Sequence, residues 1–227
     1  MKFEAEKNNT PDAANNLGGS LMASVSKSGA SDIAAEAAEI AFDSALDGGL
    51  LEEVPVFGWL MKSYNVVGAI RERIFLKKVA SFLAGTSNVS ESERAKFQED
   101  IQADPNFSRK VGEGLVLLLD RQEDFDKAII LGKVFSRYMR GHIQYEQFVK
   151  MAKSIELAYI GDLRCLAESY KKIKSYNPEL GKPFSDLLDD HTIQSLYSSG
   201  LVRSEGYTES IYYPNNVGEE ILQSLSE

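Results

Sequence analysis

The chain has 227 residues, of which 43% are hydrophobic and 26% are charged, a composition typical of a globular protein with one large domain or a domain and a small appendage. Its formal net charge of −9 argues against general nucleic-acid binding, because such binding needs Lys and Arg to neutralise phosphate. The single cysteine, Cys165, excludes an internal disulfide and favours a reducing compartment, so we expect a cytoplasmic protein.

Residues 1–29 are rich in Asn, Ser, Gly and Lys and carry only scattered large apolar side chains. Such a segment offers too little apolar surface to offset the entropy lost on ordering, so the sequence predicts a disordered tail. A helical bundle is expected over residues 30–175. Its first helix should begin at the N-cap pair Ser31 and Asp32 and end at Gly48 and Gly49.

The stretch from Leu50 to Gly85 is both the most apolar part of the chain and its strongest basic cluster. Residues 54–61 are apolar all round, which indicates burial or an interface. Helical spacing then predicts an amphipathic helix with a cationic face. Its apolar arc is expected to hold Phe75, Leu76, Val79, Phe82 and Leu83, and its polar arc Arg73, Lys77, Lys78 and Ser81.

Between Lys62 and Ala80, five basic residues stand against Glu72 alone, which gives a local charge of +4 in an acidic chain. Bulky apolar anchors beside basic residues are typical of surfaces that bind a partner protein or an anionic membrane. The candidate binding residues are Phe57, Trp59, Lys62, Arg71, Arg73, Lys77 and Lys78. Two alternatives stay open: that the stretch is simply core with a solvated basic face, and that the protein sits peripherally on the inner membrane.

Further helices are expected along the middle of the chain. Ser90 and Glu93 match a capping box, and Asp104 before Pro105 matches an N-cap followed by a first-turn proline. Residues 123–140 carry an apolar face too wide for a surface helix, so we expect that helix at the centre of the bundle, with Gly132 allowing close approach. Residues 144–174 predict one more helix, with a kink at Gly161.

The last segment changes character. After a Pro- and Gly-containing linker, residues 184–227 predict a helix, a β-hairpin and a final helix, an order that resembles half of a winged-helix module. From Ser175 to the end, two basic residues stand against nine acidic ones, a charge of −7. The alternative function, a winged-helix transcriptional regulator that binds DNA, is therefore disfavoured.

No pattern for catalysis, cofactor or metal binding is present in the sequence. His142 and His191 lie in polar, turn-like contexts and are expected to be structural or solvated. Cys165 has no identifiable His partner and is expected to be a small buried residue. The acidic run of residues 120–126 is best explained as helix capping. We therefore expect a protein that is not an enzyme and that needs no cofactor or metal.

Three segments, VPVFG at 54–58, DRQEDFDKAIILGKVFSRYMRG at 120–141 and GLV…IYYPNNVGEEIL at 200–222, together resemble bacterial and prophage proteins and, more loosely, the Abi-alpha type linked to phage defence by abortive infection. The resemblance implies a helical, non-enzymatic bacterial accessory protein with a role in phage defence. We therefore expect a mainly α fold, a multi-helix bundle with a small winged-helix-like C-terminal element, that acts through its basic amphipathic region. Homo-oligomerisation is left open.

Overall fold

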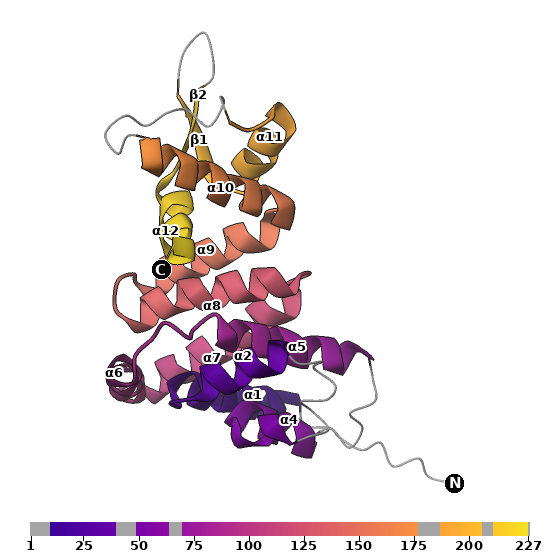
Figure 1. The fold of residues 1–227 in the computed structure, drawn as a ribbon. Helices are drawn as coiled ribbons and strands as arrows, with labels where there is room; N and C mark the ends of the chain where they lie inside the picture. Colours follow the sequence, from indigo (N-terminus) through magenta and orange to yellow (C-terminus); the bar gives the residue numbers. More distant parts are fainter. Residues whose placement is uncertain (1–9, 40–48, 64–69, 177–186, 206–210, 227) are drawn as a thin grey trace.

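The computed structural model describes residues 10–39, 49–63, 70–176, 187–205 and 211–226. Within these ranges it contains eleven α-helices, one 3-10 helix and a two-stranded antiparallel hairpin, which confirms the mainly α prediction (Figure 1). The first part comprises α1 (Thr10–Ser26), α2 (Ala30–Glu39), η1 (Leu50–Glu53), α4 (Pro55–Ser63), α5 (Ile70–Ala84), α6 (Glu91–Gln102) and α7 (Pro105–Arg121). The second part comprises α8 (Phe125–Met139), α9 (Tyr145–Leu157), α10 (Ile160–Tyr176), α11 (Asp190–Ser198), β1 (Val202–Glu205), β2 (Ile211–Pro214) and α12 (Asn216–Ser226).

Helix α8 lies in the middle of the molecule and joins the two parts, because it contacts α5 and α6 of the first part as well as α9 and α12 of its own (Figure 1). The Phe135 ring packs against Phe82 of α5 at 5.5 Å, Phe97 of α6 at 5.9 Å and Phe148 of α9 at 5.0 Å between ring centroids. A Cβ on Gly132 would overlap the carbonyl oxygen of Phe82, so only glycine lets α5 and α8 approach this closely. The predictions of a central helix and of close approach at Gly132 are confirmed.

Side-chain caps fix the starts of α6 and α7 as predicted. The Ser90 N–H donates to Glu93 Oε2 at 2.8 Å, and the Glu93 N–H donates back to Ser90 Oγ at 3.4 Å. This is the reciprocal capping box. Asp104 Oδ1 accepts from the backbone N–H groups of Asn106 and Phe107, with Pro105 as the first helical residue.

The single kinked helix predicted over residues 144–174 is wrong. Ala158 has extended backbone angles, φ −74° and ψ 142°, and separates α9 from α10. Gly161 instead lies in the first turn of α10. Ala158 is buried while Leu157 and Tyr159 are exposed, so the break itself keeps one apolar contact with the core.

The prediction of a disordered tail through residue 29 is also wrong from Thr10 onward; residues 1–9 lie outside the described part. Helix α1 buries Leu17, Leu21 and Val25, which recur every four residues on one helical face. That face packs against α7, where Gly18 and Gly112 bring the two backbones into contact. The apolar side chains are few, but their spacing concentrates all of them in the core.

Arg94 of α6 is a buried guanidinium, 3% exposed, that joins four segments. It donates to the carbonyl oxygens of Val25 at 2.5 Å, Thr86 at 2.6 Å and Val89 at 3.3 Å, and to Ser31 Oγ at 3.1 Å. Burial lowers its pKa from the usual value, but an arginine in a protein stays charged. The ends of α1, α2, α5 and α6 are thereby fixed together.

The C-terminal element contains the expected hairpin, with Val202 opposite Pro214 and Glu205 opposite Ile211. Arg137 of α8 forms a 2.7 Å salt bridge with Glu220 of α12, so the element packs directly on the bundle. The predicted linker falls mostly outside the described residues.

Two neighbouring glycines of α1 give a matched test of the α1–α7 contact. A Cβ on Gly18 would lie 2.8 Å from the carbonyl carbon of Gly112, whereas nothing lies within 4 Å of one on Gly19. We expect Gly18→Ala to lower the free energy of unfolding by about 1–3 kcal/mol through overpacking. Gly19→Ala should raise it by about 0.5–1 kcal/mol, since glycine is a poor helix former. Urea unfolding of both variants measures this, and equal effects would contradict the contact.

Substituting Arg94 tests the buried guanidinium. Arg94→Lys keeps the positive charge but cannot present the fork of donors, so several carbonyl oxygens lose their partner. We expect a loss of about 3 kcal/mol in the free energy of unfolding. The exposed Arg109 provides the control, because Arg109→Lys should change it by less than about 0.5 kcal/mol. Similar unfolding midpoints for the two variants would show that the Arg94 contacts are unimportant.

Candidate functional site

The structure removes two residues from the predicted binding surface. Phe57 is fully buried among core side chains. Lys78 is only 9% exposed, and its ammonium donates to the carbonyl oxygen of Asp120 at 2.8 Å. Ser81, also expected on the polar arc, is buried. The predicted polar arc fails at these positions because α5 contacts α2, α7 and α8, and together these helices cover more of it than one apolar face.

The remaining predicted residues differ in accessibility. Lys62, Arg71 and Arg73 are exposed, as expected for a binding surface. Lys77 is half-buried, with its ammonium 4.6 Å from the centre of the Phe125 ring, a cation–π contact within the fold. Trp59 is half-buried and packs against the core.

An open apolar groove of about 360 Å³ lies between α1, α4, α5 and α7, which neighbour one another in the N-terminal part (Figure 1). Its apolar lining comes from all four helices: Leu17, Leu60, Met61, Phe75, Leu76 and Val116. Leu117 of α7 also lines the groove and is 58% exposed. The groove therefore carries apolar surface that water contacts directly.

Polar groups of both signs complete the groove. Arg71, Glu72 and Asp120 belong to its lining. The Oε2 atom of Glu72 is buried, and no hydrogen-bond donor reaches it among the described residues. A buried acceptor left without a donor costs about 1–3 kcal/mol, so a ligand that donates there would remove that cost.

More exposed apolar surface adjoins the groove on α5. Ile70 is 78% exposed and Ile74, one turn later, is also exposed. Large aliphatic side chains exposed this far are informative when they cluster beside an apolar groove. The sequence predicted a binding surface on the segments that form α4 and α5. It did not predict that Leu17, Val116 and Leu117 would line the same groove. Their joint position follows only from the packing of α1 and α7 against α4 and α5.

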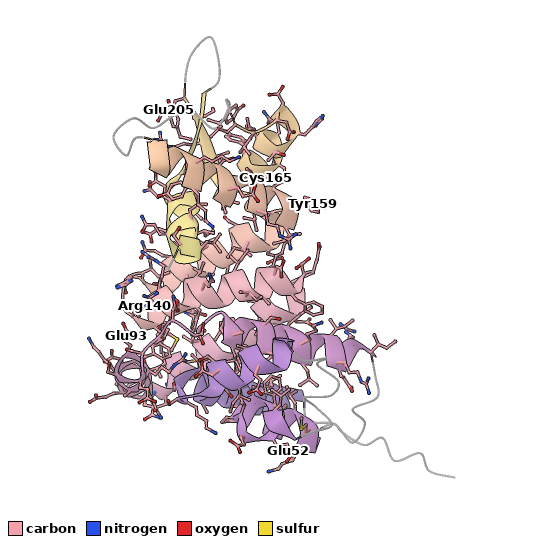
Figure 2. All side chains as sticks on the ribbon, viewed as in Figure 1. Glu52, Glu93, Arg140, Tyr159, Cys165 and Glu205 are labelled. Carbon is pink, nitrogen blue, oxygen red and sulfur yellow. The ribbon has the colours of Figure 1, made fainter. Side chains whose placement is uncertain are left out.

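The other sequence candidates do not assemble into a site. His142 and His191 are exposed. The expectation that Cys165 is buried is wrong, because α10 turns Leu163 and Leu166 to the core and leaves Cys165 exposed (Figure 2). Asp124, in the acidic run, caps α8 by accepting from the Asp126 N–H at 2.7 Å. Across the described ranges, no three His, Cys, Asp or Glu side chains come together as a metal site.

The winged-helix-like element offers phosphate few partners. Helix α11 contains Asp190 and no Lys or Arg, and Arg203 of β1 is paired with Glu205 and packs on the Tyr213 ring at 5.7 Å. A helix and strand of this kind do not attract a polyanion. In the part of the chain that the structure describes, no helix is long and apolar enough to cross a membrane.

Comparison of the chain with protein-family models, with curated proteins and with solved structures gave no match. The groove and its lining residues are therefore the basis for the function proposed below.

Proposed function

We propose that the chain is a non-enzymatic interaction protein whose groove between α1, α4, α5 and α7 binds an amphipathic helix of a partner protein. One observation carries this proposal. An apolar groove of about 360 Å³, with an exposed leucine at its edge, stands open beside charged side chains of both signs.

A partner helix suits this groove for geometric and chemical reasons. Apolar side chains spaced three or four residues apart on one helical face can enter an apolar groove together. A carboxylate of the partner would pair with Arg71. A hydroxyl or ammonium would donate to Glu72 Oε2, the buried acceptor that no donor reaches within the described ranges. The exposed Lys62 and Arg73 add positive potential near the groove and favour acidic residues on the partner's flanks.

A partner protein is favoured over an anionic membrane because of the charges at the groove. Membrane docking favours a surface of one charge sign beside its apolar anchors. Here the exposed Ile70, Ile74 and Leu117 stand beside a groove that carries Glu72 and Asp120 as well as Arg71. A concave surface of mixed charge fits another protein better than a bilayer.

The setting of this interaction is part of the proposal. We place it in the cytoplasm, as the single Cys165 favours. The role in phage defence rests on the resemblance to Abi-alpha proteins and stays a prediction.

Two leucines of equal exposure provide the test. Leu117, at the groove, is 58% exposed and Leu157, at the end of α9, is 59% exposed. A photo-cross-linking amino acid placed at each position in the producing cells should capture a partner from 117 and not from 157. With the purified partner, Leu117→Glu should weaken binding at least tenfold, because a buried leucine contributes about 1.5–3 kcal/mol.

The matched variant Leu157→Glu should change the partner's dissociation constant by less than about twofold. Vesicles of phosphatidylglycerol serve as the membrane arm of the same experiment. If position 117 cross-links to phospholipid alone, or if the chain binds the vesicles and Leu117→Glu abolishes that binding, the groove binds a membrane and not a partner protein. A captured partner whose affinity is the same for both variants would refute the groove as its binding site.

A further inference from the structure

A second cavity, of about 330 Å³, lies away from the groove and contains both rings and charges. It is bounded by α6, the start of α7, the end of α8 and the residues that lead into α9. Its apolar surface comes from Phe97, Ile101, Phe107, Tyr138, Met139 and Ile143. The volume is at the lower end of the range for ligand sites, so it suits one small molecule.

The rings of this cavity already use edge-to-face geometry. Phe97 meets Tyr138 at 5.6 Å and 82°, and Phe107 packs on Tyr145, which lies outside the lining, at 5.5 Å and 83°. Phe107 and Tyr138 are half-buried, so part of each ring is left for a further aromatic ring, which packs favourably on a ring edge or face. Burial is the main cause that raises the pKa of Tyr138 to about 12, in keeping with a phenol held largely away from water.

Four charged residues, two of each sign, line the cavity: Glu93, Lys96, Asp100 and Arg140. The three on α6 are spaced three, four and seven residues apart and so share one face of the helix. Arg140, the C-cap of α8, lies beside Glu93 (Figure 2) and donates to Ser136 O at 3.3 Å and to Ser136 Oγ at 3.4 Å, so it is already engaged. The Glu93 carboxylate is engaged by Ser90, which leaves Asp100 as the acid for a ligand.

Lys96 and Asp100 form no ion pair with each other, although both are described and lie one turn apart. A lining with two positive and two negative groups matches a ligand that is neutral overall but carries separated charges. A simple anion or cation would meet two groups of its own sign, which is unfavourable. The combination of rings and opposed charges therefore indicates an aromatic zwitterion.

We propose that this cavity binds a free aromatic α-amino acid of the phenylalanine type. Its ring lies among Phe97, Phe107 and Tyr138. Its carboxylate pairs with Lys96, and its ammonium pairs with Asp100. The groove and this cavity share no lining residue, so the two proposals stand or fall separately.

Titration calorimetry on the full chain tests the proposal with L-phenylalanine, 3-phenylpropionate and phenethylamine. We expect L-phenylalanine to bind with a dissociation constant of about 1 mM or lower. The analogues that lack the ammonium or the carboxylate should bind at least tenfold more weakly, because each loses a charge-assisted hydrogen bond. Leu117→Glu should leave this binding unchanged.

Surface variants of α6 assign the contacts. Asp100→Asn should weaken L-phenylalanine about tenfold and leave 3-phenylpropionate unaffected, whereas Lys96→Gln should weaken L-phenylalanine and leave phenethylamine unaffected. Glu99→Gln, on the same helix but outside the lining, is the control and should have no effect. No heat with L-phenylalanine at about ten times the expected constant, or equal losses from Asp100→Asn and Glu99→Gln, would overturn the proposal.

Discussion

The buried guanidinium of Arg94 is the contact on which the N-terminal part of this protein depends. Removing a charge from water is expensive unless every donor finds an acceptor. Here the backbone oxygens of Val25, Thr86 and Val89, together with Ser31 Oγ, provide acceptors. Because these groups sit at or next to the ends of α1, α2 and α5, one side chain holds together three helices, of which α1 and α5 also line the groove.

The central helix α8 explains how one bundle can carry two unrelated cavities. Its buried side chains contact α5 and α6 on one side and α9 and α12 on the other. The apolar groove lies between the helices that precede α8, and the charged aromatic cavity lies at its C-terminal end. Phe135 packs against rings from α5, α6 and α9, so the walls of the second cavity are held by the core itself.

Local chemistry made several features predictable from the sequence, whereas packing decided the rest. The capping box is predictable because Ser90 and Glu93 are only three residues apart. The close helix approach at Gly132 is predictable because glycine has no Cβ. Helix α1 was missed because residues 1–29 as a whole are rich in Asn, Ser, Gly and Lys, although Leu17, Leu21 and Val25 recur at helical spacing. Lys78 was predicted to be exposed because a helical wheel shows only the faces of α5 itself. It does not show which other helices pack against those faces. The groove combines residues about one hundred positions apart, which no local pattern reports.

Amide hydrogen exchange of α1 in the full chain is the most direct test of this account, because the groove exists only if α1 is folded against α7. We expect the amides of Leu21, Met22 and Val25 to exchange slowly, with protection comparable to that of α8, and Arg94→Lys to reduce the protection of α1 selectively. Exchange of these amides at the rate of an unstructured peptide would contradict it, since the groove would then lack one of its walls.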